Sequence, residues 1–140
     1  MGIFLDTGFY FALLSKKDIN HKRSQEILIK IGEGIYGRIC TSNFVFNESM
    51  TLLNVRTRGN RKDLLEKMSV LFLGSEPIAE MIKMENNWLQ EIVDLQIKIT
   101  KGGNPISFTD CSNIIICQKL NLTKIVSFDS HYDGFLTKIY

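Results

Sequence analysis

The sequence predicts an α/β domain with a mostly parallel sheet and helices on both of its faces. Short apolar runs end at polar segments, as buried parallel strands do, and stretches with helical periodicity fill the intervals between them. This alternation of strands and helices is typical of a parallel sheet covered on two sides. Because 140 residues is a common size for one domain, we predict a single domain over residues 1–140.

Composition and charge exclude several classes of protein. The hydrophobic fraction of 44% and the charged fraction of 23% are ordinary for a soluble globular domain. A net charge of +2 permits a nucleic-acid partner without requiring one. No apolar run reaches the roughly 18 residues of a membrane span, so no membrane partner is expected. Three cysteines without a CxxC pair argue against a disulfide framework and predict a cytoplasmic location, where they serve as small buried apolar residues.

The first half of the chain is expected to contain two strands and four helices. Ile3–Leu5 is an apolar run that stops at a polar segment, and Gly32 and Gly34 end the second helix. Thr41-Ser42-Asn43 offers N-caps for the third helix, and Asn60 offers one for the fourth. The expected elements are strands at 3–5 and 35–40 and helices at 8–14, up to 31, 44–56 and 60–73.

The second half is expected to add two strands and two helices. A helix capped by Asn87 shows one broad apolar face through Ile99, and the loop Lys101–Pro105 ends it. The expected elements are strands at 78–84 and 124–128 and helices at 87–99 and 107–120.

Two aspartates follow predicted strands directly. Asp6 comes after the first strand and Asp129 after the last. In parallel α/β sheets, ligands bind beyond the carboxyl ends of the strands, near the point where the strand order reverses. Either aspartate alone is also explained as the start of a turn or a helix cap, but two in one sheet favour a binding site.

Glu48 lies in an otherwise apolar face of its predicted helix. Its helical neighbours are Phe44, Val45 and Leu52, and no basic residue stands three or four positions away to neutralise it. A buried carboxylate needs a partner or a metal. The alternative is a glutamate at the edge of the apolar stripe with its carboxylate in water.

Asp110 occupies the third helical position of a capping box that begins at Ser107. Capping alone explains an acid there. Asn113 follows one turn later on the same face, and a second polar side chain suits a lined cavity better than a cap requires. The two roles are compatible.

Convergence of these four carboxylates predicts a metal site. Like charges about 4 Å apart repel by ~1 kcal/mol in water and by ~4 kcal/mol at an effective dielectric typical of protein surfaces. A divalent cation removes that repulsion, and oxygen ligands without a His or Cys cluster favour magnesium or manganese over zinc. His21 and His131 stand alone in the sequence and are expected at the surface or in support of the ligands.

The order of these motifs resembles that of the PIN-domain ribonucleases. The resemblance covers the whole chain and is most specific in its last third, where Ile106–Asp110, an apolar helix, Leu120–Lys124 and Ile125–Asp129 follow one another. It implies a PIN-like three-layer α/β/α fold with a short central parallel sheet.

The resemblance also implies a site and a reaction. Asp6, Glu48, Asp110 and Asp129 correspond to a metal-binding, catalytic quartet, with Mg²⁺ or Mn²⁺ as the cofactor and RNA phosphodiester hydrolysis as the reaction. Supporting positions are Thr7, Asn113, Ser127 and Asp133, the last with an open role.

The small single-domain members of this family include VapC-type toxins, which the chain resembles in length and layout. This implies an endoribonuclease toxin of a type II toxin–antitoxin pair, an antitoxin partner and a homodimer formed through the apolar helical hairpin at 43–73. An RNA-maturation nuclease of the same fold and a non-catalytic RNA- or protein-binding module stay open as alternatives. A haloacid dehalogenase-type phosphotransferase is disfavoured because Gly8 stands where its second aspartate is needed.

Two basic clusters flank the predicted site. One follows the Glu48 helix and the other follows the first strand, and both are candidates for RNA phosphate contacts, with solvated helix ends as the alternative. The first cluster is Arg56, Arg58, Arg61 and Lys62, and the second is Lys16, Lys17, Lys22 and Arg23. The neighbouring aromatic residues Phe9, Tyr10 and Phe11 are expected in the core, with stacking on a base as the alternative.

Overall fold

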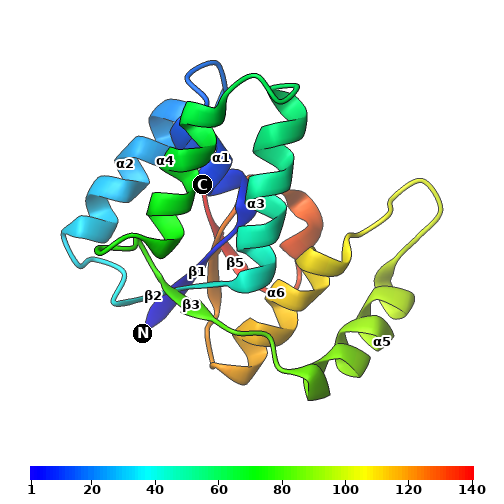
Figure 1. Ribbon diagram of the computed structural model, residues 1–140. Helices are drawn as coiled ribbons and strands as arrows, with labels where there is room; N and C mark the ends of the chain where they lie inside the picture. The colour runs from blue at the N-terminus through cyan, green and yellow to red at the C-terminus, as the bar shows by residue number, and fades with distance from the viewer.

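A five-stranded sheet, parallel throughout, forms the centre of the computed structural model, which describes residues 1–140 (Figure 1). The strand order is β3-β2-β1-β4-β5. The strands are β1 (Gly2–Leu5), β2 (Arg38–Ser42), β3 (Glu80–Ile82), β4 (Lys124–Val126) and β5 (Thr137–Ile139). The predicted α/β class with a parallel sheet is confirmed.

Six α-helices cover the two faces of the sheet. They are α1 (Thr7–Leu14), α2 (His21–Gly32), α3 (Asn43–Arg56), α4 (Lys62–Leu73), α5 (Leu89–Ile99) and α6 (Phe108–Lys119), with short 3₁₀ turns η1 (Asn86–Trp88) and η2 (Ser130–Tyr132). Helix α1 packs against α2, α3 and α4, and α5 packs against α6. Figure 1 shows α2 and α4 on one side of the strands and α5 and α6 on the other.

The strand order reverses between β1 and β4. The chain moves outward from β1 through β2 to β3, then crosses to β4 on the other side of β1. Right-handed crossovers therefore place the first four helices on one face and the last two on the opposite face. The crevice for a ligand is expected at this reversal, beyond the carboxyl ends of β1 and β4.

The core is built around β1 and α6. Every residue of β1 is buried, and so is every residue of α6 from Asp110 to Cys117. A helix buried on all sides has to be apolar or to satisfy its polar groups internally. The three cysteines are free and buried, as predicted. No helix of the structure is long and apolar enough to cross a membrane.

Three strands differ from their predicted bounds and one was missed. Strand β2 begins at Arg38 because Gly34 and Gly37 adopt positive φ angles of 76° and 72° and make a turn of the segment predicted as strand. Strands β3 and β4 are shorter than predicted. Strand β5 went unnoticed because only three residues, one of them Lys138, pair with β4 at the edge of the sheet.

Of the three helix starts at which the sequence predicted a cap in this way, one has it and two do not. The Ser42 hydroxyl accepts a hydrogen bond from Val45 N at 3.1 Å, so the predicted capping of α3 is confirmed. The prediction for Asn60 is wrong, since α4 begins at Lys62 with no side-chain cap. The prediction for Asn87 is also wrong, because η1 precedes α5 and leads into it without one.

The Ser42 cap predicts a measurable loss of stability in a Ser42→Ala variant. Removing the hydroxyl leaves a buried N–H of α3 without its partner, which costs about 1 kcal/mol in the free energy of unfolding. Urea denaturation measures the difference. Ser69→Ala is the control, because its hydroxyl contacts only the Glu66 carbonyl at an exposed position of α4, and it should change stability by less than about 0.5 kcal/mol. Equal stability of the two variants would contradict the role of the cap.

Candidate active site

A cavity of about 540 Å³ opens at the reversal point, beyond the carboxyl ends of β1 and β4. All four carboxylates singled out in the sequence line it, together with residues of α1, α3 and the β4–η2 segment. The lining is Asp6, Thr7, Gly8, Glu48, Leu52, Asp110, Ser127, Phe128, Asp129, Ser130 and Lys138. The sheet topology therefore gathers carboxylates that are up to 123 positions apart, from Asp6 to Asp129, in one place.

Asp6 is positioned by the end of β1 and the start of α1. Its backbone N–H donates to the Val126 carbonyl at 3.2 Å, which extends the β1–β4 ladder by one residue. Its Oδ1 then accepts from Thr7 N at 2.7 Å as the N-cap of α1. Capping and participation in the cavity thus occur in the same side chain, which is only 4% exposed.

Two further donors hold the Asp6 carboxylate. Asn113 Nδ2 on α6 donates to Oδ1 at 3.1 Å, and the Ser127 hydroxyl donates to Oδ2 at 3.0 Å. Burial nevertheless raises the pKa of Asp6 to about 7, helped by the negative charges of Asp110 and Glu48 and opposed by the hydrogen bonds from Thr7 and Ser127. In the absence of a cation, the site therefore favours a protonated Asp6 near neutral pH.

Asp110 is held from both of its oxygens. The Ser107 hydroxyl caps α6 by accepting from Asp110 N at 3.0 Å, as the capping-box pattern predicted. The Tyr132 hydroxyl donates to Oδ1 at 2.9 Å, and His131 Nδ1 lies 2.6 Å from Oδ2. Asn113 Nδ2 also donates to the Tyr132 hydroxyl at 2.9 Å, so one amide group connects the supports of both aspartates.

His131 brings the nearest titratable positive charge to the carboxylates. Its hydrogen bond to Asp110 raises the pKa of the imidazole, with the charge of Asp129 acting in the same direction and burial opposing it. Its Nδ1 lies 3.3 Å from an oxygen of Asp129, whose other oxygen accepts from His131 N at 3.0 Å. A protonated His131 thus offsets part of the local negative charge.

The carboxylates form two overlapping groups. Ligand atoms of Asp6, Glu48 and Asp110 lie within 4.8 Å of one another, and so do ligand atoms of Asp110, Asp129 and His131. Asp110 belongs to both groups. Carboxylate oxygens at this spacing are the hard ligands that magnesium and manganese take, so the donor set fits a divalent cation.

Two buried oxygens beside the carboxylates have no hydrogen-bond partner. They are Asn113 Oδ1 and Thr7 Oγ1. An unpaired buried acceptor costs free energy unless a water or an ion satisfies it. Their position beside Asp6 adds to the fit of a hydrated cation.

Asp133 is the one predicted supporting residue that neither lines the cavity nor hydrogen-bonds to one of its carboxylates. Its carboxylate is exposed and forms an ion pair with Lys138 Nζ at 3.3 Å. The positive φ of 90° at Gly134 marks the turn that takes the chain away toward β5. Thr7 and Ser127 line the cavity, and Asn113 lies behind Asp6.

Sequence reasoning missed Tyr132 and Lys138. It also did not predict that His131 contacts both Asp110 and Asp129. Tyr132 is completely buried, and its pKa is raised well above the usual value because of burial and the charges of Asp6 and Asp110. The signal was the pair His-Tyr directly after Asp129-Ser130. Its meaning depends on η2, which turns both side chains back toward Asp110.

The predicted RNA-contacting cations are divided by the structure. Lys16, Lys17, Arg56 and Arg61 line a second cavity. Neither cavity is lined by the other four, which are Arg58, Lys62, Lys22 and Arg23. Phe9 and Tyr10 are fully buried, and Phe11 is 8% exposed, so the prediction that these aromatics belong to the core is confirmed.

Comparison with known proteins places the chain in a family. The model of the PIN domain family matches residues 3–135. A VapC ribonuclease of Archaeoglobus fulgidus is 26% identical over 133 residues, which cover 94% of this chain and 80% of that protein. The crystal structure of Mycobacterium tuberculosis VapC20, a Sarcin-Ricin loop cleaving toxin, superimposes with a TM-score of 0.78 at 22% identity, over 96% of this chain and 97% of VapC20.

The chain belongs to the PIN-domain family. Both relatives are VapC proteins, which confirms the resemblance to VapC-type PIN proteins that the motifs predicted. The PIN-like α/β/α architecture is confirmed as well.

The raised pKa of Asp6 predicts that the metal-free protein loses stability as the pH increases. Between about pH 4 and pH 7 the unfolded chain has released this proton and the folded chain still holds it, so raising the pH favours unfolding by up to about 1.4 kcal/mol per unit. Urea denaturation in EDTA at pH 5, 6 and 7 measures this slope. It should be smaller in Asp6→Asn.

Asp94→Asn is the control for this experiment, because Asp94 is exposed on α5 and bonded only to Gln90. It should keep the wild-type slope. His131 acts in the same direction in all three proteins, since its raised pKa also gives stability that is lost as the pH rises. The charge of Asp6 is the last of the causes that raise the pKa of His131, so the difference between slopes reports Asp6 together with this smaller effect on His131. Identical slopes in wild type and Asp6→Asn would contradict the raised pKa of Asp6.

Proposed function

We propose that this chain is an endoribonuclease that requires Mg²⁺ or Mn²⁺, with Asp6, Glu48, Asp110 and Asp129 as metal-binding and catalytic residues. The single observation that carries the proposal is the convergence of carboxylate oxygens from β1, α3 and α6 within 4.8 Å in one cavity. A protein gains nothing in stability from such a cluster by itself, because the charges repel. The family and the names of its relatives support the choice of RNA as the substrate.

The reaction is hydrolysis of a phosphodiester bond. A water oxygen forms a bond to phosphorus and the bond from phosphorus to the leaving ribose oxygen breaks. The water gives up one proton, and the leaving oxygen takes up one and becomes a hydroxyl. A divalent cation, when bound, supplies Lewis-acid activation of the water and stabilises charge on the phosphate and leaving oxygens. No residue of the cavity has to form a covalent intermediate.

Neighbouring side chains hold the carboxylates of Asp6 and Asp110 in fixed orientations. Thr7 N, Asn113 Nδ2 and the Ser127 hydroxyl fix both oxygens of Asp6, so its carboxylate presents one orientation to the cavity. Tyr132 and His131 fix Asp110 in the same way. Such preorganised ligands do not have to reorganise during the reaction. Preorganisation of this kind supplies much of an enzyme's rate enhancement.

Lys138 on β5 is placed to contact the substrate. It lines the cavity together with Ser127 and Asp129, and its ammonium group forms an ion pair with the exposed Asp133. A lysine here can attract a phosphate oxygen of the RNA toward a cavity whose other charges are negative.

A toxin of a type II toxin–antitoxin system is the specialisation we propose, with an antitoxin protein as its partner. Two VapC relatives support it, one of them a toxin that cleaves the Sarcin-Ricin loop.

Cytoplasmic location remains a prediction that the free cysteines support. A homodimer through α3 and α4 also remains a prediction. It is supported by the exposed apolar side chains of these helices, since Val55, Val70 and Leu73 are 69%, 60% and 60% exposed. Analytical ultracentrifugation distinguishes a monomer from a dimer.

The proposal predicts metal-dependent cleavage of RNA that is lost when a ligand is removed. We expect the purified protein to cut a mixed, structured RNA with Mg²⁺ or Mn²⁺, to stop in EDTA, and to lose activity by about 100-fold or more in Asp6→Asn and Asp110→Asn. Gel analysis of the products measures the rate. Asp94→Asn should cut as the wild type does, and equal behaviour of all four proteins would exclude the quartet from catalysis.

A stability measurement tests metal binding apart from cleavage. Mg²⁺ should raise the melting temperature of the wild type at pH 8 and do so less at pH 5.5, because binding needs a deprotonated Asp6. Asp6→Asn should show a smaller shift at pH 8, while Asp94→Asn should show the wild-type shift. A shift of equal size in all three proteins would place the metal elsewhere.

A further inference from the structure

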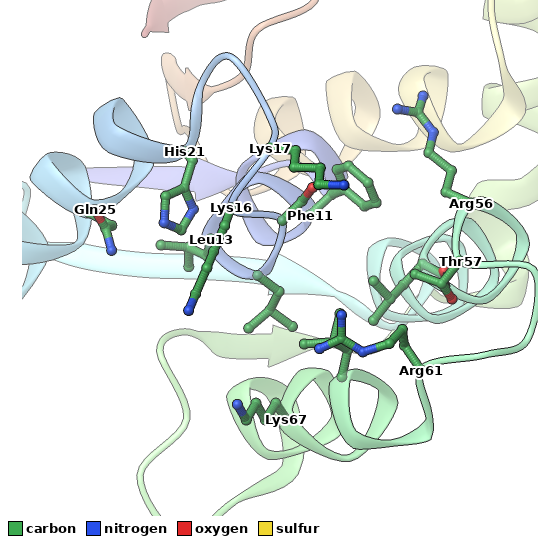
Figure 2. A pocket seen from close by; sticks show the side chains of 14 residues that line it. Phe11, Leu13, Lys16, Lys17, His21, Gln25, Arg56, Thr57, Arg61 and Lys67 are labelled. Carbon is green, nitrogen blue, oxygen red and sulfur yellow. Dashed lines mark hydrogen bonds between the residues drawn. The ribbon is translucent and has the colours of Figure 1, made fainter.

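A second cavity of about 700 Å³ lies between the α1–α2 loop, the last turn of α3 and α4. Every charged side chain that lines it is positive: Lys16, Lys17, Arg56, Arg61 and Lys67. Figure 2 shows Lys16, Arg61 and Lys67 extending toward one another across its opening, with Lys17 and Arg56 beside Phe11. We call this hollow the basic cavity.

Most of this positive charge has no acidic partner within the chain. Arg61 forms a bidentate pair with Asp63, at 3.0 Å and 2.9 Å. No ion pair includes any of the other four cations, although cations elsewhere, such as Arg38 and Lys119, do have carboxylate partners. Like charges gathered around one hollow create a positive potential that favours an anionic ligand.

The floor of the basic cavity is apolar. Leu13, Leu14, Leu53 and Leu64 line it together with Phe11, and the Arg56 guanidinium stands 5.0 Å above the Phe11 ring. A ligand for this hollow should therefore carry both negative charge and flat or apolar groups. Single-stranded RNA carries both, because its phosphates can meet the cations while a base packs on apolar side chains or on an arginine plane.

The basic cavity and the carboxylate cavity share two helices. Helix α1 contributes Thr7 and Gly8 to the carboxylates and Phe11 to the basic cavity, and α3 contributes Glu48 to the first and Arg56 to the second. Glu48 and Arg56 are separated by eight residues of helix, which is about 12 Å. A stacked strand with a rise of about 3.4 Å per nucleotide covers that distance with three to four nucleotides.

We propose that the basic cavity holds the single-stranded RNA segment that flanks the bond to be cleaved, with Lys16, Arg61 and Lys67 on its phosphates. This inference rests on the proposed ribonuclease function. It follows from the sign of the charges, because four carboxylates and one lysine, Lys138, line the first cavity, so most of the attraction for a polyanion has to come from elsewhere. The basic cavity is the larger of the two hollows, lies within reach of the same strand, and contains no acid.

Equilibrium binding of a fluorescein-labelled 12-nucleotide single-stranded RNA tests the proposal. The binding protein is Asp6→Asn, so that the RNA stays intact, and the variants in that background are Lys16→Gln/Lys67→Gln and the control Lys30→Gln/Lys124→Gln. Lys30 is in the last turn of α2 and Lys124 begins β4, so the control removes two charges at the amino end of the sheet. Neither residue lines one of the cavities. All four side chains are outside ion pairs.

The expected result is a loss of both affinity and salt dependence in the cavity variant. Each phosphate contact with a single strand contributes about 0.7 to the slope of log affinity against log salt, so the slope should fall by about 1.4 and the affinity at 50 mM salt by about tenfold or more. The control should keep the slope of Asp6→Asn, and all proteins should melt at similar temperatures.

Each alternative outcome has a distinct meaning. Equal slopes in the cavity and control variants, with normal RNA cleavage by the wild type, would overturn the RNA assignment and leave the nuclease intact. No cleavage by the wild type, with the expected loss of slope, would overturn the nuclease and keep RNA in the basic cavity. If the cavity variant binds RNA normally but loses binding of a synthetic Leu/Glu amphipathic helical peptide, the occupant is an acidic protein helix and the RNA assignment is wrong.

Discussion

The structure depends on the burial of one carboxylate, Asp6, where the chain leaves β1 beside the end of β4. Its three hydrogen-bond donors come from separate segments: Thr7 on α1, Asn113 on α6 and Ser127 after β4. The same bonds that join these segments also aim the carboxylate into the cavity. They do not fully offset burial and repulsion, since the pKa of Asp6 is still raised to about 7. The fold thus supplies hydrogen bonds to Asp6 but does not neutralise the negative charges gathered around it. A bound proton or a bound cation removes that repulsion.

Features fixed by local physics could be predicted from the sequence, and features fixed by tertiary contacts could not. Asp6 and Asp110 were placed correctly because the end of a β-strand and a capping box are written in a few adjacent residues. Tyr132 was missed because its role depends on a 3₁₀ turn that directs a buried hydroxyl to α6. The role of Asp133 was left open, and its place also depends on tertiary structure: one residue after η2, the chain has already turned toward β5.

Errors in the elements have a similar origin. Ile35 looked like the start of a strand because it is apolar, yet it is 52% exposed in a turn between two glycines of positive φ. Apolar character is a statement about average burial, so a single isoleucine cannot overrule turn chemistry on both of its sides. Asn60 looked like a helix cap, but the preceding residues Arg58 and Gly59 adopt positive φ angles and delay α4 until Lys62.

Helix α3 explains how charges of opposite sign can coexist near one RNA strand. It presents Glu48 to the carboxylate cavity and Arg56, in its last turn, to the basic cavity. A cation at the carboxyl end of a helix is favoured by the helix dipole, so Arg56 is well placed without an acidic partner. Because Val45 and Leu53 anchor α3 in the core, the spacing between the two cavities is that of a rigid helix. For an RNA strand bound at the basic cavity, the distance to the carboxylates would therefore be set by the rigid helix and not by a flexible loop.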